Sequence, residues 1–294
     1  MKQFYLAEIV TKDKLVHQGL FFRPKKSGKK AILWIHGLTS TFYNNVTLFE
    51  SIVEVCEKNG MGFAAFNNRG HDIVTGMRKI DEHEPKGYRK VTGGAGNERF
   101  EDCVYDIEAG ISFLADRGFA DIILAGHSSG ANKACYYGGV KKDKRVCGIA
   151  LISPVSDRLD PGLDKEKTAR RIAEMKKEIA HGRGDELLAG IHMFPVTPRR
   201  MVSLYGPRSA EDTFDYGDPN PTLSSFRAIR VSTLILMGSL DEYLDRPVEQ
   251  MLDVFASRSG AKNFQYVIIR GALHGFNGKE REMAGALIRW AKEL

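Results

Sequence analysis

The stretch Ala125-Gly126-His127-Ser128-Ser129-Gly130-Ala131 (AGHSSGA) places a serine between two glycines, directly after the apolar run 122–124. A strand that ends in glycine, a small polar residue and glycine must turn sharply, and glycine allows close approach because it has no Cβ. The side chain of Ser128 would then stand exposed at the bend, in front of the N–H groups of a following helix. Both a nucleophile elbow and an ordinary tight turn fit this pattern.

Short apolar runs alternate with amphipathic helical patterns along most of the chain. Continuous apolar runs of this length are typical of strands that are buried on both faces. Buried strands are predicted at residues 31–35, 62–66, 122–124, 146–152, 231–237 and 264–269. Helices are predicted at about residues 45–58, 100–117 and 129–137, and from about residue 279 onward. The alternation predicts an α/β fold with a mostly parallel, doubly wound sheet and helices on both faces.

Two segments interrupt the alternation. Residues 71–98 show no clear periodicity and are predicted to form a long connection. Residues 155–228 contain helical patterns at 165–180 and 185–190 but no buried strand. An insertion of this length between two strands usually folds over the edge of the sheet. The chain is therefore divided into an α/β core, residues 1–154 and 229–294, and a helical cap or lid, residues 155–228.

A catalytic serine needs a base within hydrogen-bond reach. Among the eight histidines, His274 is the best placed, because it follows the last predicted strand and precedes the last helix. An acid that orients it should follow an earlier strand, and Asp241 comes directly after the strand at 231–237, which the cap precedes. The chain order Ser128, Asp241, His274 is the order of a triad on a parallel sheet. His127 is interpreted as a packing residue that points away from the serine.

Acyl transfer also needs two donors for the oxyanion that forms on the carbonyl carbon. One is predicted to be the backbone N–H of Ser129, the residue after the nucleophile. The other should come from the loop after the strand at 31–35, where His36-Gly37-Leu38 stands. The N–H of Leu38 is assigned this role, and Gly37 gives the backbone room to approach.

Five motifs in order carry a resemblance to a known superfamily. They are HGL at 36–38, NNRGHD at 67–72, GHSSG at 126–130, GSLDEY at 238–243 and GALHGF at 271–276. Over residues 28–154 and 229–294 the chain resembles the α/β-hydrolases, and within them it loosely resembles a branch of uncharacterised hydrolases that includes fungal siderophore esterases. Relatives usually read D-x-R-G-H-G where this chain has NNRGHD. This departure affects the expected roof of the pocket rather than the triad.

The motifs and the resemblance together predict a serine hydrolase that cleaves an ester, or a thioester or amide, through an acyl-enzyme. No metal and no organic cofactor is implied, and the expected partner is a small-molecule ester. Acyl transfer or lyase chemistry on the same scaffold stays open, because the sequence does not show what attacks the acyl-enzyme. A ligand-binding protein of the same fold is a further alternative. Such proteins typically lack a triad member, whereas all three are present here.

The amino-acid composition bears on nucleic-acid binding, membrane association and location. Hydrophobic residues at 43% and charged residues at 27% are typical of a globular protein. The formal net charge is +6, and the sequence contains no block of five like charges. Nucleic-acid binding is therefore not expected. No uncharged apolar run reaches the ~18 residues of a membrane span, and the first residues do not resemble a secretory signal. A cytoplasmic location is predicted, and the oligomeric state is left open.

The predicted cap contains two arginines that are candidates for substrate binding. Arg199 and Arg200 follow Pro198 in a segment that is predicted to be a loop near apolar residues. Guanidinium groups match carboxylate geometry. The pair is therefore predicted to contact an anionic or polar acyl group, with a preference for medium, polar substrates over long aliphatic esters.

Overall fold

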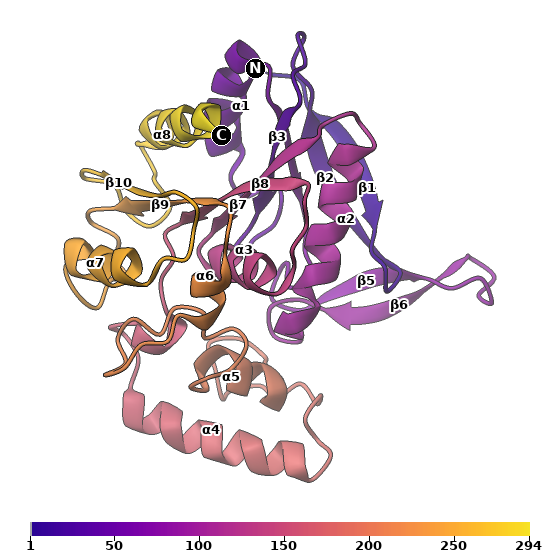
Figure 1. Cartoon of the computed structure of the whole chain (residues 1–294). Helices are drawn as coiled ribbons and strands as arrows, with labels where there is room; N and C mark the ends of the chain where they lie inside the picture. The colour runs from indigo at the N-terminus through magenta and orange to yellow at the C-terminus, as the bar shows by residue number, and fades with distance from the viewer. Residues whose placement is uncertain (1) are drawn as a thin grey trace.

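A computed structural model describes residues 2–294 of the chain, and within these residues ten strands form one mixed sheet (Figure 1). The strands are β1 (Tyr5–Val10), β2 (Leu15–Phe22), β3 (Lys30–Ile35), β4 (Gly62–Phe66), β5 (Thr75–Ile80), β6 (Tyr88–Gly93), β7 (Asp121–His127), β8 (Val146–Ile152), β9 (Ser232–Gly238) and β10 (Phe264–Ile269). The α-helices are α1 (Val46–Asn59), α2 (Cys103–Ala115), α3 (Ser129–Val140), α4 (Lys165–Ala180), α5 (Pro198–Tyr205), α6 (Ser224–Ala228), α7 (Val248–Arg258) and α8 (Glu280–Glu293). Two short 3-10 helices are η1 (Phe100–Asp102) and η2 (Asp157–Leu159). None of the helices in this part of the chain combines the length and the apolar character that crossing a membrane requires.

The central part of the sheet is parallel, as predicted. Strands β10, β9, β8, β7, β3 and β4 lie side by side in this order and run parallel. Strand β2 pairs antiparallel with β4, β1 and β5, and β6 pairs antiparallel with β5. The prediction of a mostly parallel sheet with flanking helices is therefore confirmed, and the N-terminal strands and a hairpin add an antiparallel part to it.

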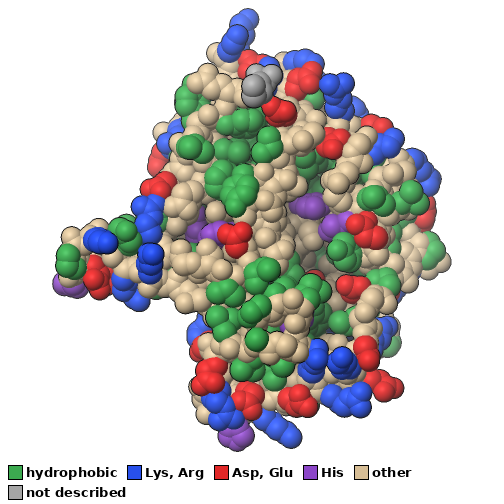
Figure 2. Space-filling model, turned by 180° about the vertical axis from the view of Figure 1, so that it is seen from behind, with side chains coloured by type: hydrophobic (Ala, Val, Ile, Leu, Met, Phe, Trp, Pro, Cys, Tyr) green, Lys and Arg blue, Asp and Glu red, His purple; other side chains and the backbone are tan. Residues whose placement is uncertain are grey.

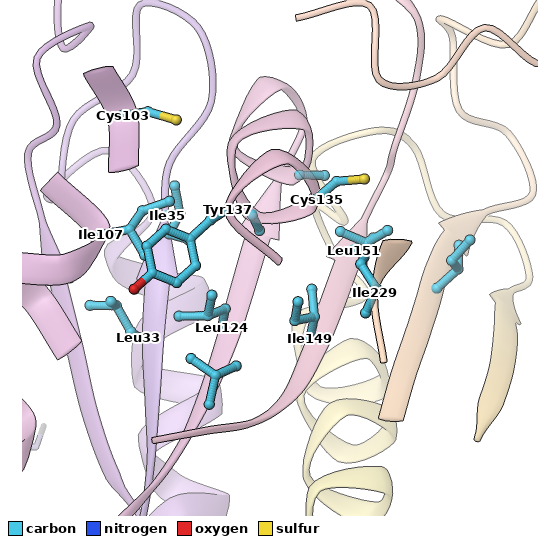
Figure 3. Packing of buried hydrophobic residues seen from close by; sticks show 14 of the residues in the cluster. Leu33, Ile35, Cys103, Ile107, Leu124, Cys135, Tyr137, Ile149, Leu151 and Ile229 are labelled. Atoms are coloured by element: carbon cyan, nitrogen blue, oxygen red, sulfur yellow. The ribbon is translucent and has the colours of Figure 1, made fainter. Parts of the chain in front are cut away.

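Alternate residues of the central strands pack on opposite faces of the sheet, because successive side chains of a strand point to opposite sides. Ile123 belongs to the cluster on the side of α1 and α8, whereas Leu124 belongs to the cluster on the side of α2 and α3. Figure 3 shows Leu33, Leu124 and Ile149, from three neighbouring strands, close to Tyr137 of α3. This packing fixes α3, and with it the turn that precedes α3.

The segment 71–98 was predicted to be an irregular connection, and this prediction is wrong. It contains the antiparallel hairpin of β5 and β6, in which Thr75 lies opposite Gly93 and Ile80 lies opposite Tyr88. The hairpin extends away from the body of the protein (Figure 1). Most of its side chains are polar and at least partly exposed, so the sequence lacks the apolar alternation by which a strand is usually recognised.

The segment 155–228 lies between β8 and β9 and contains η2, α4, α5 and α6. Helix α4 matches the helix that was predicted at 165–180. Helices α4 and α5 lie at the end of the molecule opposite the chain termini (Figure 1). The division of the chain into a core and a cap stays a prediction, and the name cap is used below for residues 155–228.

Two local predictions within the cap are wrong. Residues 185–190 are irregular instead of helical, and a single bridge joins Leu188 to Val196. The segment after Thr197 is helix α5 instead of a loop. Its start is specified locally, because Pro198 occupies the first turn and the Thr197 side chain accepts the N–H of Arg200 at 3.2 Å.

Candidate active site

Ser128 occupies a strained turn between β7 and α3. Its backbone dihedrals are φ 56° and ψ −129°, a combination that residues with a side chain rarely adopt. The Ser128 N–H donates to the carbonyl of Ile152 at 2.9 Å, so the turn is tied to the end of the neighbouring strand β8. The sharp bend that the sequence predicts is present, and it directs the serine into a cavity at the ends of the parallel strands.

Three glycines make this turn possible. A Cβ on Gly126 would collide with the carbonyl of Gly130, and a Cβ on Gly130 would collide with the carbonyl of Ile35. A Cβ on Gly37 would lie 2.9 Å from the Cβ of Ser128. The obstructing groups at Gly126 and Gly130 are backbone atoms, which cannot rotate away.

We therefore expect Gly130→Ala to lower the free energy of unfolding by about 3 kcal/mol, the upper part of the range for overpacking. The matched control is Gly76→Ala, since nothing lies within 4 Å of a Cβ at Gly76 and its φ is not positive. That variant should be neutral or more stable by about 0.4–1 kcal/mol. Urea unfolding of both variants measures the difference. Equal stabilities would contradict the close approach at the elbow.

The structure brings His274 and Asp241 together. The Nδ1 atom of His274 lies 3.0 Å from Oδ1 and 2.9 Å from Oδ2 of Asp241, whose side chain is fully buried. Burial raises the pKa of Asp241, but the hydrogen bond and charge of His274 outweigh it, so the pKa lies below its ordinary value. Asp241 is therefore ionised at neutral pH and can orient the His274 ring.

Ser128 and His274 line the same cavity, which leaves Nε2 of His274 as the ring nitrogen available to the serine. A hydrogen bond between their side chains is not formed within the described residues. Hydrogen bonds of this kind are often long in structures without substrate and shorten when substrate binds.

The backbone of His274 is anchored by three side chains that do not belong to the predicted triad. Glu242 Oε2 accepts the N–H of His274 at 2.9 Å. The carbonyl of His274 accepts from Nε2 of His127 at 2.9 Å and from Oγ of Ser153 at 3.2 Å. His127 also stacks on Trp34, with ring centroids 6.0 Å apart. The sequence predicted the packing of His127, but not that His127 lines the same cavity as Ser128. It indicated no anchoring role for Glu242 or Ser153.

The two N–H groups that were predicted to bind an oxyanion belong to Leu38 and Ser129. Leu38 lines the cavity, and Ser129 is the first residue of α3. Neither N–H donates to a backbone carbonyl in residues 2–294. The first N–H groups of a helix have no partner within the helix and carry the positive end of its dipole. Neither N–H is therefore committed to a backbone carbonyl, and their role in binding an oxyanion stays a prediction.

The cavity has a volume of about 320 Å³ and is lined by loops at the strand ends and by the cap. Its walls include the cap residues Phe194, Tyr205 and Met193, and Met193 is 85% exposed at the surface. Figure 2 shows hydrophobic side chains gathered on the lower part of the molecule, with histidine side chains just above them. A larger groove of about 780 Å³ lies between α1 and α8, but it contains none of the predicted catalytic residues.

The charge of the cavity wall is negative. Asp157 and Asp160 line it, and no Lys or Arg does so among the described residues. Burial raises the pKa of Asp157 to about 7, and the charge of Glu211 acts in the same direction. Groups of three or more His, Cys, Asp or Glu that could hold a metal ion do not occur in residues 2–294.

The two cap arginines that were predicted to bind substrate do not line the cavity, which corrects that expectation. Arg200 is fully buried, donates from Nη2 to Glu98 Oε1 at 2.9 Å and pairs through Nη1 with Glu211. Arg199 lies at the surface and donates to Asp185 at 3.2 Å. Helix α5 is the reason, because it turns Arg200 into the protein and Arg199 outward. A loop would have imposed neither direction.

Comparisons with known proteins agree with this fold. A family model described as "Protein of unknown function (DUF1749)" matches residues 92–290, more than half of the chain. No curated protein sequence matches the chain. In structure the chain is similar to an esterase of Pyrococcus furiosus, with 18% sequence identity, coverage of 99% of this chain and 91% of that chain, and a TM-score of 0.61.

Two further solved structures are similar over nearly their whole length. Est1E of Butyrivibrio proteoclasticus, solved with bound ferulic acid, has 16% identity, coverage of 98% of each chain and a TM-score of 0.64. A thermostable carboxyl esterase of Bacillus coagulans has 12% identity, coverage of 100% of this chain and 99% of that chain, and a TM-score of 0.65. At these identities the similarity establishes the α/β-hydrolase fold. The finer likeness to fungal siderophore esterases stays a prediction.

Proposed function

The chain belongs to the DUF1749 family and has the α/β-hydrolase fold, and from this premise we propose that it is a serine hydrolase that cleaves a small-molecule ester. The observation that carries the proposal is the Asp241–His274 contact at 2.9 Å, in which His274 lines the same cavity as the strained Ser128. Each member follows a different parallel strand, so the sheet itself holds the three residues in place.

In the proposed mechanism, Ser128 Oγ attacks the carbonyl carbon of the ester while Nε2 of His274 takes the hydroxyl proton. Asp241 holds the ring by Nδ1 and stabilises the imidazolium that forms. The carbonyl oxygen becomes an oxyanion and accepts from the N–H groups of Leu38 and Ser129. His274 then protonates the leaving alcohol. Water, activated by the same ring, hydrolyses the acyl-enzyme and restores Ser128.

The cavity supports a substrate of modest size that carries no negative charge near the cap. A volume of about 320 Å³ lies at the lower end of the range of small-molecule sites. An anionic acyl group would meet Asp157 and Asp160 without a facing Lys or Arg within the described residues. We therefore replace the preference for anionic groups, which rested on Arg199 and Arg200, by a preference for neutral or cationic esters.

This preference should depend on pH through Asp157. The carboxyl group faces Glu211 and Asp160, which raise its pKa, and Arg200 and His274, which lower it, and burial is the largest influence. Below its pKa of about 7 Asp157 is neutral, and above it the side chain is an anion. The kcat/KM of a trimethylammonium ester, relative to that of its neutral tert-butyl isostere, should therefore rise as the pH increases through about 7.

Asp157→Asn removes the charge and keeps the shape of the side chain. Two opposite unit charges about 4 Å apart attract each other by ~4 kcal/mol at an effective dielectric constant of about 20, so the ratio of the two kcat/KM values above pH 7 should fall at least about tenfold in this variant. Comparing the two isosteric substrates in the same protein at each pH cancels any effect that is common to both. If wild type and Asp157→Asn give the same ratio at every pH, Asp157 plays no part in recognition.

The proposed function itself is tested by a hydrolysis screen. Purified protein is assayed against esters of increasing acyl length and against matched thioesters and amides, with Ser128→Ala protein as the blank. Turnover of short and medium esters by wild type alone supports the proposal. Faster product formation when an alcohol replaces water as the acceptor would favour acyl transfer on the same scaffold. Binding of esters without any turnover would favour a ligand-binding protein.

A further inference from the structure

We propose that a buried chain of ion pairs and hydrogen bonds connects the cap to the oxyanion loop, defined as residues 36–40, and that Lys133 and Asn68 in this chain are positioning residues for catalysis. The proposal rests on the proposed function, because it concerns how the N–H of Leu38 is held for the oxyanion. None of the predicted triad residues takes part in the chain.

At the oxyanion loop, Asn68 fixes the ring of His36. The Asn68 N–H donates to Nε2 of His36 at 3.0 Å, and its Nδ2 donates to the His36 carbonyl at 3.3 Å. Because Nε2 accepts, Nδ1 carries the proton and donates to the Gly37 carbonyl at 2.9 Å. Burial lowers the pKa of His36 to about 3, and the charge of Lys133 acts in the same direction. A neutral His36 of defined tautomer therefore holds the peptide that ends in the N–H of Leu38.

The side chain of Asn68 is held in turn by Lys133, which lies on α3 behind the elbow. Lys133 Nζ donates to Oδ1 of Asn68 at 3.0 Å and to Oε2 of Glu98 at 2.7 Å. Both partners of this ion pair are almost completely buried. Burying an ammonium group is unfavourable unless it is paired, and an apolar pair of similar volume is often at least as stable. The lysine therefore calls for an explanation other than stability, and its hydrogen bond to Asn68 provides one.

The cap forms the other end of the chain. Arg200 of α5 donates to Glu98 Oε1 at 2.9 Å, pairs with Glu211 and donates from Nε to the Ala95 carbonyl at 2.8 Å. Asn132, the neighbour of Lys133 on α3, donates to the Glu211 carbonyl at 3.0 Å. Two neighbouring residues of α3 thus contact both segments: Asn132 binds the cap, and Lys133 binds the loop that carries Glu98.

The continuous path from Arg200 through Glu98, Lys133 and Asn68 to His36 has a specific kinetic consequence. A hydrogen bond to an oxyanion strengthens only as the charge develops in the transition state, so a displaced N–H lowers kcat more than it changes KM. Misplacements of about 1 Å can lower rates by about 10². A network that only stabilised the fold would change the unfolding temperature and leave kcat of the folded protein unchanged.

The test uses two independent variants of the full chain. Lys133→Met/Glu98→Gln removes both charges of the buried pair, so that neither is left unpaired. Asn68→Ser keeps every charge and shortens the side chain that Lys133 holds. The control is Lys58→Met on α1, which removes an exposed lysine that pairs with Glu54 at 3.1 Å. For each protein we would measure kcat and KM on a neutral ester. We would also measure the affinity for a trifluoromethyl ketone that forms a tetrahedral oxyanion, and for the matching unreactive methyl ketone.

We expect both variants to lose about 10- to 100-fold in kcat and a similar factor in affinity for the trifluoromethyl ketone, with KM and methyl ketone affinity within about twofold of wild type. The control should match wild type. If either variant folds with unchanged kcat, or changes KM alone, the proposal is overturned. If the wild type does not react with a fluorophosphonate at Ser128, the proposed function fails, and the positioning roles fail with it.

Discussion

Replacing Ser128 by alanine is expected to lower kcat on a neutral ester by a factor on the order of 10⁴–10⁶, the loss seen when the nucleophile of a triad is removed. Without Oγ the acyl-enzyme on residue 128 cannot form, although His274 and the proposed oxyanion N–H groups remain. The measurement is hydrolysis of a chromogenic ester under saturating conditions. A variant that keeps more than about a tenth of wild-type kcat would remove Ser128 from the mechanism.

The fold should survive this change, which stability measurements on two variants can show. The hydroxyl of Ser128 makes no hydrogen bond within the part of the chain that the structure describes, and the backbone strain at φ 56° and ψ −129° remains with alanine. Glycine can adopt this conformation without a Cβ clash. Strain of this kind costs ~1–3 kcal/mol, so Ser128→Gly should be about 1 kcal/mol more stable than Ser128→Ala, with both inactive. A Ser128→Ala protein that does not fold would instead indicate that the serine supports the core.

Asp241→Asn is expected to lower kcat by about 10²–10⁴, because an amide at this position favours the wrong tautomer of the imidazole. Both carboxylate oxygens of Asp241 lie within 3.0 Å of Nδ1 of His274, and the side chain is completely buried. The amide NH₂ group would face Nδ1 as a donor and would no longer stabilise the imidazolium. The loss should appear in kcat/KM as well as in kcat, since the charge matters mainly in the transition state.

Two neighbouring carboxylates provide matched comparisons. Asp245 pairs with Arg246 at 2.7 Å and does not contact His274, so Asp245→Asn should keep wild-type kcat. Glu242 accepts the backbone N–H of His274, which a glutamine oxygen can still do. Glu242→Gln should therefore lower kcat less than tenfold, which is about 1.4 kcal/mol. A large loss in Asp245→Asn, together with none in Asp241→Asn, would show that the acid was assigned to the wrong residue.

The positions of Ser128, Asp241 and His274 could be predicted because each follows an apolar strand, although β10 is an edge strand that is only partly buried. The carboxyl ends of neighbouring parallel strands meet at one edge of the sheet, so residues that are far apart in sequence are brought together there. The strands β7, β9 and β10 lie within one parallel set, and the three residues follow their ends. Local sequence signals were therefore sufficient for this part of the site.

The directions of the two cap arginines could not be predicted from the sequence. Whether Arg199 and Arg200 face the cavity depends on the rotation of helix α5, and the Thr197-Pro198 start of that helix was read as loop. Arg200 can be buried because two carboxylates, those of Glu98 and Glu211, pair with its guanidinium group. Both glutamates lie more than ten residues away from Arg200 in the sequence. No local pattern in the sequence indicates such long-range pairing.

The hairpin β5–β6 and the role of Asn68 were missed for related reasons. The hairpin is half exposed and charged, and it forms because β2 offers a short pairing edge at Leu15 and Val16. Asn68 was noticed only as part of a motif that departs from the usual one. Its contacts with His36 and Lys133 come from three separate elements and could be found only once these were placed together.

The measurement that most directly tests the central claim is labelling of the purified protein with a fluorophosphonate, followed by peptide mass spectrometry. A nucleophilic serine beside a base reacts with such reagents, whereas an ordinary serine does not. We predict one adduct per chain on Ser128, its absence in Ser128→Ala, and much slower labelling in Asp241→Asn. A wild-type protein that stays unlabelled, or that carries its adduct on another residue, would contradict the assignment of Ser128 as the nucleophile of a hydrolase.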